Sequence, residues 1–128
     1  MVSFEISAFF PVSSEELYSA WLDSEQHSAI TGGKAICSKK EGEAFTAWDG
    51  YITGINQKLV KGKEIIQSWR TSDFNDSDSH SLLTLKFSKT DNGCELTLIH
   101  SEIPEGQPDY EQGWEQHYFE PMKEYFSK

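Results

Sequence analysis

Four histidines are the side chains in this sequence best suited to acid–base chemistry, because imidazole changes its charge near neutral pH. They are His27, His80, His100 and His117. We expect His27 in a short helix and His80 after a polar loop, both exposed to solvent. Nucleophilic catalysis also needs a Ser or Cys beside such a base, and the spacing of the sequence places none there. The sequence therefore predicts no catalytic site.

Metal binding is poorly supported as well. Glu115, His117 and Glu120 lie close together in the sequence, but on a helix Glu115 points away from the other two, so three ligands do not converge. Cys37 and Cys94 lack the CxxC spacing of a zinc site or a disulfide framework. A Gly-rich phosphate loop is also missing from the sequence. We predict neither a metal ion nor another cofactor.

The charge balance excludes two classes of partner. The chain of 128 residues carries 11 basic and 21 acidic side chains, for a net charge of −10. Such a surface repels phosphates, which argues against binding to nucleic acids or to anionic membranes. Acidic residues are frequent from Glu102 onward. They are interpreted as a solvated helix face, and the alternative is a contact surface for a basic protein partner.

The N-terminal segment 2–10 alternates between apolar and polar residues, as a strand does, and does not look like a secretion leader. No stretch approaches the ~20 apolar residues that a membrane span needs. Since the two cysteines are isolated, a reducing cytoplasm fits best. The length predicts one domain over residues 1–128.

Two short helices are predicted after the first strand. Ser13 and Glu16 have the spacing of a capping box, and an apolar stripe continues to Trp21. A second short helix is expected over 23–30, before the Gly-Gly pair at 32–33.

Consecutive strands are predicted from Lys34 to Ser101, because turn sequences such as Asp49-Gly50 and Asn92-Gly93 separate the apolar runs. The polar segment 72–79 is predicted to form a longer loop. With no βαβ alternation, the sheet should be antiparallel.

Helical spacing returns over residues 109–126, where Asp109 is a plausible cap and Trp114, Tyr118 and Met122 share one face. Pro121 lies inside this segment and should bend the helix.

These elements contain short motifs whose order and spacing match a known family. The motifs are Ser14-Glu15-Glu16-Leu17-Tyr18, Phe45 ahead of Asp49-Gly50, Gly54, Trp69-Arg70, Leu83-Thr84-Leu85-Lys86-Phe87, Glu95-Leu96, Ile103-Pro104 and Gly113-Trp114-Glu115-Gln116-His117-Tyr118-Phe119. Over essentially its whole length the chain resembles the activator of heat-shock protein 90 ATPase homologue family, of the C-terminal-domain type, within the START-like (SRPBCC) superfamily.

The resemblance implies an α+β helix-grip fold. In this fold a curved antiparallel sheet of about six or seven strands wraps a long C-terminal helix, and two short helices follow the first strand. In the eukaryotic activators a separate N-terminal domain supplies much of the chaperone contact, and the sequence shows no counterpart of it. We therefore expect chaperone binding to be the second interpretation rather than the first. Some START-like relatives are cyclases or hydrolases, which keeps an enzyme as a third.

Strand alternation assigns a set of side chains to the space between sheet and C-terminal helix. This set is mostly apolar and includes three polar members, as small-molecule pockets do. The candidate cavity residues are Phe45, Ile52, Asn56, Gln67, Trp69, Leu83, Leu85, Leu98, His100, Trp114, Tyr118 and Met122. The alternative is a filled core. Gly54 fits both interpretations, since a missing side chain either opens space or permits close packing.

The sequence thus favours a non-enzymatic domain that binds a small apolar or amphipathic molecule between sheet and helix. The alternative is a protein-interaction module that binds or stimulates a heat-shock protein 90 ATPase.

Overall fold

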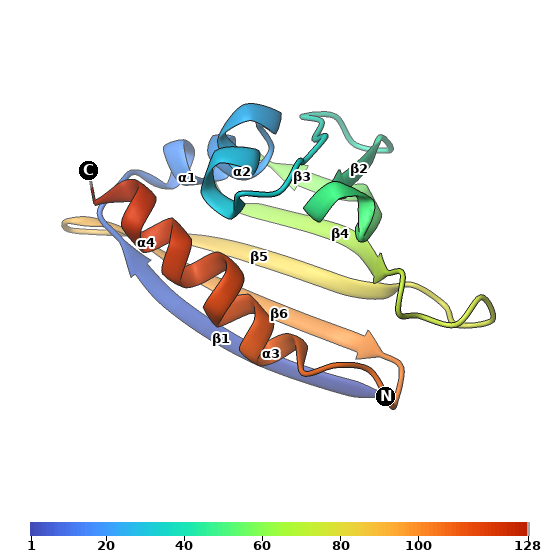
Figure 1. Ribbon diagram of the computed structural model, residues 1–128. Coiled ribbons are helices and arrows are strands. Elements are labelled where there is room, and N and C mark those ends of the chain that lie inside the picture. The colour runs from blue at the N-terminus through green and yellow to red at the C-terminus, as the bar shows by residue number, and fades with distance from the viewer. Residues whose placement is uncertain (128) are drawn as a thin grey trace.

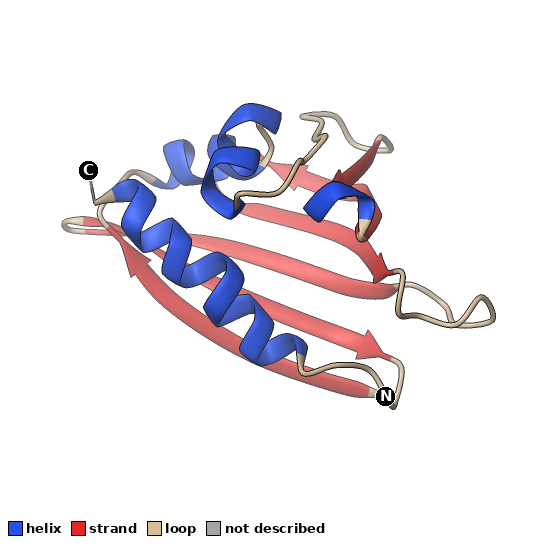
Figure 2. Cartoon of the chain, in the orientation of Figure 1, coloured by secondary structure: helices blue, strands red, loops and turns tan. Residues whose placement is uncertain are grey.

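The computed structural model describes residues 1–127, in which helices pack on one face of a six-stranded antiparallel sheet (Figure 1, Figure 2). The strands are β1 (Val2–Phe10), β2 (Ala44–Ala47), β3 (Ile52–Val60), β4 (Glu64–Thr71), β5 (Ser81–Thr90) and β6 (Gly93–Ile103). The helical segments are α1 (Ser14–Trp21), α2 (Ser24–Thr31), η1 (Trp48–Gly50), α3 (Tyr110–Trp114), η2 (Glu115–Phe119) and α4 (Glu120–Phe126). The order across the sheet is β1-β6-β5-β4-β3-β2. This arrangement confirms the predicted α+β fold.

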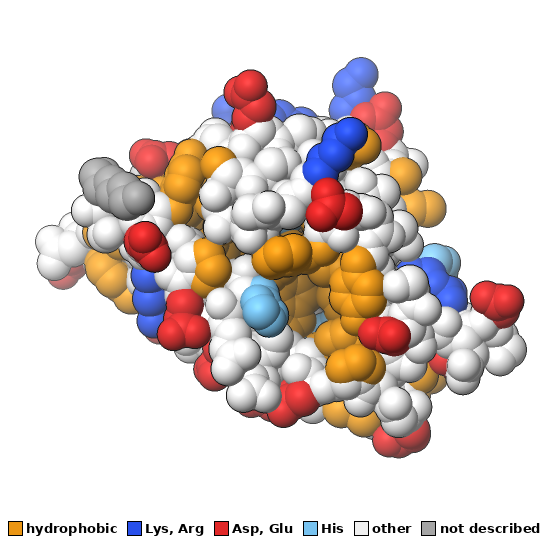
Figure 3. Space-filling view, in the orientation of Figure 1, with side chains coloured by type: hydrophobic (Ala, Val, Ile, Leu, Met, Phe, Trp, Pro, Cys, Tyr) orange, Lys and Arg blue, Asp and Glu red, His pale blue; other side chains and the backbone are white. Residues whose placement is uncertain are grey.

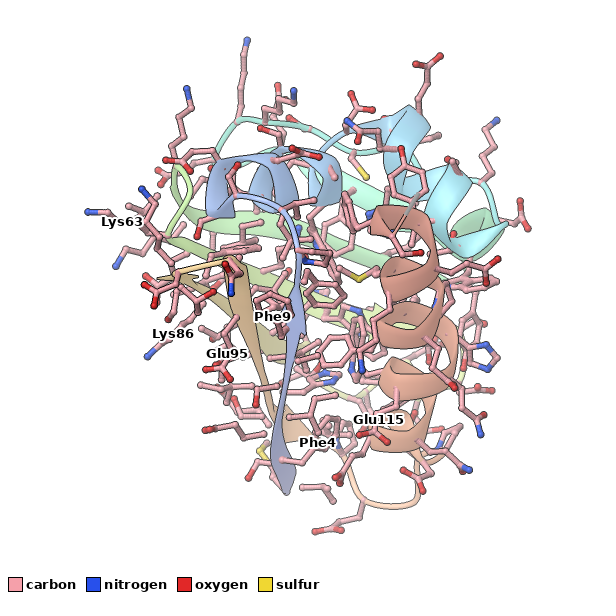
Figure 4. All side chains as sticks on the ribbon, turned by 90° about the vertical axis from the view of Figure 1, so that its left-hand side faces the viewer. Phe4, Phe9, Lys63, Lys86, Glu95 and Glu115 are labelled. Atoms are coloured by element: carbon pink, nitrogen blue, oxygen red, sulfur yellow. The ribbon has the colours of Figure 1, made fainter. Side chains whose placement is uncertain are left out.

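The alternation of side chains along each strand produces one buried and one exposed face. On β5 and β6, Leu85 is paired with Leu98, and both are fully buried. Lys86 and Glu95 project from the side of the sheet that faces away from the C-terminal helix (Figure 4). The facing assignments made from the sequence are confirmed, because each predicted inward residue is buried.

Gly54 allows close packing and does not open space. A Cβ atom at this position would lie 1.9 Å from the carbonyl oxygen of Ser68 and 2.6 Å from a ring carbon of Phe45. The ring of Phe45 therefore occupies the room that the missing side chain leaves.

The segment 34–43 is the main departure from the predicted elements, since it forms no regular strand. It contributes a single bridge, between Ile36 and Thr46. Its backbone groups bond to side chains instead: Ser24 Oγ accepts from the amide of Cys37, and Ser28 Oγ accepts from the amide of Ala35. These side-chain bonds satisfy donors that a strand would satisfy through a ladder.

The segments α3, η2 and α4 form one continuous helix over residues 110–126. As predicted, Asp109 caps it, accepting a bond from the amide of Gln112. Within it, the amide of Glu120 bonds to the carbonyl of Glu115, a π-type bond that spans five residues. Pro121 directly follows this π turn. None of the helices in residues 1–127 reaches the length and hydrophobicity that a membrane-spanning helix requires.

Candidate functional site

An open groove of about 480 Å³ lies between the C-terminal helix and the end of the sheet where β3 and β4 meet η1. In the space-filling view it appears as a hollow framed by hydrophobic side chains, with a histidine at its edge (Figure 3). Its lining residues are Trp48, Tyr51, Ile52, Trp69, Pro108, Asp109, Tyr110, Gly113, Trp114, His117 and Tyr118. The volume lies within the range of small-molecule pockets.

The helix supplies one wall. Tyr110, Trp114 and Tyr118 recur every fourth residue and so face the same way. The ring centroids of Trp114 and Tyr118 are 4.7 Å apart. Trp69 of β4 packs against this wall, with its ring centroid 5.0 Å from that of Tyr110 and 5.6 Å from that of Trp114. Gly113 leaves the helix surface bare between these rings, and a Cβ atom there would meet nothing within 4 Å.

The opposite wall depends on a strained turn. Trp48 and Asp49 have positive φ angles of 53° and 59°, a conformation that is costly for a bulky L residue. Lys34 holds this turn, since its amide bonds to Asp49 Oδ1 and its carbonyl accepts from the amide of Asp49. The Trp48 ring lies against Gly33, where a Cβ atom would be only 2.9 Å away. A glycine at position 33 is thus what permits Trp48 to stand beside the groove.

A buried histidine fixes the orientation of Trp114. The indole Nε1 donates to His100 Nδ1 at 3.1 Å, so this ring nitrogen carries no proton and Nε2 carries one. His100 Nε2 then donates to Ser81 Oγ at 2.8 Å, and that hydroxyl donates to the carbonyl of Trp69 at 2.6 Å. Burial lowers the pKa of His100 to about 3. The imidazole is therefore neutral at physiological pH and locks the positions of two groove tryptophans.

His27 fixes the orientation of Tyr118 in the same way. The prediction that His27 is exposed is wrong. Its side chain is 4% exposed. Nδ1 bonds to the carbonyl of Trp21 at 2.8 Å, and Nε2 lies 2.9 Å from the hydroxyl of Tyr118. A carbonyl only accepts, so Nδ1 is the donor and the neutral ring accepts from Tyr118 at Nε2. Burial lowers the pKa of His27, in spite of the bond to Trp21, which raises it.

Two tyrosines of the groove also have their hydroxyl groups engaged. Tyr51 donates to a carboxylate oxygen of Asp73, and Tyr110 donates to Gln107 Oε1 at 2.8 Å while lying 2.7 Å from the hydroxyl of Thr71. Burial is the main cause that raises the pKa of each phenol. Both phenols are therefore neutral, and their O–H groups are bonded to other side chains of the protein.

Only part of the predicted cavity set meets at this groove. Ile52, Trp69, Trp114 and Tyr118 line it. The remaining eight do not, and all of them are buried in the packed core. They are Phe45, Asn56, Gln67, Leu83, Leu85, Leu98, His100 and Met122. The space directly between sheet and helix is thus largely filled, and the opening lies at one end of it.

The two buried amides have structural partners. Gln67 Nε2 donates to Asn56 Oδ1 at 2.8 Å, and Asn56 Nδ2 donates to the carbonyls of Ser38 and Lys40. These bonds attach the irregular segment 34–43 to the sheet. Gln67 Oε1 has no hydrogen-bond partner among the described residues. Both amides therefore act in the core and lie outside the groove lining.

Several groove residues were not identified from the sequence. Trp48, Tyr51, Tyr110 and His117 were not assigned to any face. Only their positions in the sequence could have indicated these residues, since Trp48 and Tyr51 flank the Asp-Gly turn and Tyr110 follows the helix cap. Strand alternation does not reach residues in turns, so the method that found the sheet wall could not find these side chains.

Six of the eleven residues that line the groove are Trp or Tyr. Residues 1–127 contain no group of three His, Cys, Asp or Glu side chains placed to hold a metal ion. Cys37 lies nearby in the fold, and burial raises the pKa of its thiol to about 11, so it is held in its less reactive thiol form. Of these aromatic rings, Trp114 and Tyr118 are held by buried hydrogen bonds.

Comparisons with known proteins agree on one family. Residues 11–127 match the family model described as Activator of Hsp90 ATPase homolog 1-like protein. The chain is 32% identical over 119 residues to a mouse protein, Activator of 90 kDa heat shock protein ATPase homolog 1, covering 91% of this chain and 35% of that one. A homologous activator from Dictyostelium discoideum is 27% identical over 122 residues, 92% of this chain and 31% of the relative. The chain thus spans about a third of the length of these curated relatives.

Solved structures support the same fold. An HSP90 activator from Plasmodium falciparum superposes with a TM-score of 0.89 at 26% identity, covering 99% of this chain and 97% of that one. The Aha1 dimer from Colwellia psychrerythraea gives a TM-score of 0.78 at 13% identity, covering 99% and 95%, which supports the fold alone. These similarities, with the six-stranded sheet around the C-terminal helix, confirm the helix-grip fold.

Proposed function

The chain belongs to the Activator of Hsp90 ATPase homolog 1-like family, and from this premise we propose that it is a non-enzymatic binding domain whose ligand site is the aromatic groove. The observation that carries the proposal is the open volume of about 480 Å³ among six aromatic side chains. Three of these side chains, Trp48, Tyr51 and Tyr110, are half-buried, so part of each remains in contact with solvent. An apolar or amphipathic ligand that covers them removes apolar surface from water, which is favourable.

The groove is preorganised for such a ligand. Trp114 and Tyr118 are held by His100 and His27, and both rings are less than a tenth exposed. A rigid wall loses little conformational freedom on binding, so more of the interaction free energy appears as affinity.

Intrinsic fluorescence tests the proposal directly, because three of the four tryptophans line the groove. A library of small aromatic and aliphatic molecules is screened by tryptophan fluorescence and by the shift in melting temperature. Native mass spectrometry of freshly purified protein then reports any ligand that copurifies. We expect at least one class of apolar compound to bind and to raise the melting temperature.

A groove-filling variant makes the test specific. Gly113→Leu places a side chain in the open space, and leucine favours a helix more than glycine does, so this variant should remain folded and lose binding. Gln112→Leu is the matched control, since its side chain is exposed and outside the lining. Binding that persists in Gly113→Leu, or no binding by any compound, would reject the groove as the site.

A second candidate function is contact with a heat-shock protein 90 chaperone. Two relatives carry the name of activators of its ATPase, and the structure adds an acidic surface to this similarity. Glu111, Glu115, Glu120 and Glu124 are all exposed on the C-terminal helix. A stripe of this kind is complementary to a basic surface on a partner.

An ATPase assay with the cognate chaperone tests this second function. We expect added protein to stimulate turnover and the fourfold variant E111Q/E115Q/E120Q/E124Q to lose much of the effect at low salt. The control variant E5Q/D76N/D91N/E95Q removes the same charge from exposed positions elsewhere and should keep it. Unchanged turnover at saturating protein, with no complex at low salt, would contradict the chaperone role.

A further inference from the structure

We propose that the aromatic groove selects an organic cation, namely a methylated ammonium group carried on a small apolar body. The inference rests on the proposed function, because it names the chemical class of ligand for the same groove. Four features of the groove support it: its charges, its ring faces, its hydrogen-bond donors and its size.

The charge of the lining favours a cation. None of the eleven lining residues is Lys or Arg, and Asp109 places a carboxylate at the mouth. A second carboxylate, that of Asp73, accepts a hydrogen bond from the hydroxyl of the lining residue Tyr51. The whole chain carries a net charge of −10. The potential at the groove therefore attracts positive ligands and repels carboxylates and phosphates.

The ring faces provide the matching short-range attraction. Three tryptophans and three tyrosines line the groove, coming from η1, β4, the C-terminal helix and the loop before β3. The face of an aromatic ring carries negative charge density, and tryptophan binds cations most strongly among the aromatic side chains. Rings that meet from several directions can surround an ammonium group and replace its water.

Four of the hydrogen-bond donors in the groove lining are already used, which disfavours an anion. The phenolic O–H of Tyr51 donates to Asp73, that of Tyr110 to Gln107, and that of Tyr118 to His27. The indole N–H of Trp114 donates to His100. An anionic ligand needs such donors to replace its hydration, and these four point at protein acceptors instead. A methylated ammonium needs none of them.

The size of the groove allows a cation with an aromatic body. About 480 Å³ exceeds the need of a bare ammonium ion and matches a small aryl-substituted one. Such a ligand joins the favourable burial of apolar surface to the attraction between cation and rings. Neutral molecules of the same shape gain only the burial of apolar surface.

Three probes of nearly equal shape separate these contributions. They are 4-(hydroxymethyl)phenyl-trimethylammonium, 4-tert-butylbenzyl alcohol and 4-(hydroxymethyl)benzenesulfonate, which carry a positive, a neutral and a negative group at the same position. Isothermal titration of the full chain at pH 7.5 measures the affinity of each. We expect the cation to bind about five- to thirtyfold more tightly than the neutral probe, and the sulfonate to bind most weakly.

A charge-neutral variant of the groove tests the electrostatic part. Asn caps a helix as well as Asp does, so Asp109→Asn keeps the cap on Gln112 and removes the carboxylate. We expect it to lower the affinity for the cation about two- to threefold, the modest effect typical of an exposed charge, and to leave the neutral probe unchanged. Asp91→Asn, at the exposed turn between β5 and β6, is the matched control and should change neither.

The possible results distinguish the two proposals. Equal binding of cation and neutral probe, or tighter binding of the sulfonate, overturns the cation preference and leaves the groove as a ligand site. Failure of all three probes to bind overturns the cation preference, whereas the proposed ligand site falls only if no compound of the library binds. Cation binding that Gly113→Leu does not weaken places the cation outside the groove and overturns the inference as well.

Discussion

Trp114 is the residue on which the groove and the core depend together. Its ring packs against Trp69 and Tyr118, and its N–H group satisfies the buried His100. We expect Trp114→Ala to lower the free energy of unfolding by roughly 3–5 kcal/mol, because it leaves a cavity and an unpaired imidazole nitrogen. Urea unfolding measures the loss.

Trp114→Phe separates the two contributions, since it keeps an aromatic ring and removes the donor. Leaving His100 Nδ1 unpaired should cost about 1–3 kcal/mol. Gln116→Ala, an exposed change on the same helix, serves as the control and should stay within about 0.5 kcal/mol of the wild type. A cost below about 1 kcal/mol for Trp114→Ala would contradict the packing described above.

Gln67 shows how the structure changes a prediction made from the sequence. The sequence placed this amide among the candidate cavity residues, and if it oriented a ligand there, Gln67→Leu would abolish binding and spare stability. Because Gln67 bonds to Asn56 in the core, we now expect the reverse. Gln67→Leu should lower the free energy of unfolding by about 1–3 kcal/mol, since Asn56 Oδ1 loses its donor.

Ligand affinity at the groove should be unchanged in Gln67→Leu, because Gln67 is not among the lining residues. The matched control is Gln57→Leu, an exposed amide on the neighbouring strand, which should alter neither property. Parallel titration and urea unfolding of both variants decide the matter. A stable variant that no longer binds ligand would restore the interpretation drawn from the sequence.

The burial and the partners of single residues were the hardest features to predict from the sequence. His27 lies in a polar helix, and nothing within a few residues indicates burial. Its partner Tyr118 is 91 residues away in the sequence, so only the tertiary fold brings the two together. The turn with positive φ at Trp48 and Asp49 is likewise held by a residue outside it, since Asp49 bonds to Lys34.

At the scale of elements, the sequence was far more informative. Alternation gave the inward faces of the strands, and Ser13 and Asp109 cap helices as expected. Segment 34–43 was not predictable, because its backbone bonds to serine hydroxyl groups of α2 rather than to a neighbouring strand.

The π turn explains how the C-terminal helix keeps one face on the sheet. Trp114, Tyr118, Met122 and Phe126 are buried at intervals of four residues. In a regular α-helix with 3.6 residues per turn, this spacing would rotate the buried stripe by about 120° over its length. A π turn inserts about one extra residue and returns the stripe by about 100°. The predicted helix was therefore correct, but the irregularity next to Pro121 took a form that the sequence did not specify.

Gly113 lies in this helix, and we expect its replacement to raise the stability of the protein and to lower its affinity for ligand. Its backbone is helical and its neighbourhood is open, so Gly113→Ala should raise the free energy of unfolding by up to about 1 kcal/mol. The added methyl group narrows the groove, and ligand affinity should fall. Thermal unfolding and probe titration on the same samples measure both effects. A variant that is less stable, or one that binds more tightly, would show that the groove wall differs from the geometry described above.

At the scale of the whole molecule, the charge is distributed so that no Lys or Arg lines the groove. Basic residues such as Lys63 and Lys86 project on the far side of the sheet from the C-terminal helix (Figure 4), whereas the exposed surface of that helix is rich in Glu. The fold therefore presents aromatic rings within an acidic surface. Neither composition nor alternation predicts such an arrangement, since both ignore which segments meet in space.

The two buried histidines make the stability of the whole fold depend on pH. Burial lowers the pKa of both from the ordinary value of 6.5, to about 3 for His100. The unfolded chain takes up these protons near pH 6.5 and the folded chain does not. Below that pH the unfolded state therefore binds more protons, and the free energy of unfolding falls. The contribution of His100 is complete above pH 6.5 and is lost progressively toward pH 3.

Each neutral histidine should add a slope of about 1.4 kcal/mol per pH unit well below pH 6.5. Urea unfolding from pH 7.5 to pH 4.5 measures this slope. His100→Gln should reduce the slope by the contribution of one histidine. His80→Gln, at an exposed position, should leave the slope unchanged. The three proteins have the same acidic residues, so the difference in slope between them isolates the buried imidazole. An equal slope in the wild type and His100→Gln would mean that His100 is protonated in the folded state, which is incompatible with its bond from Trp114.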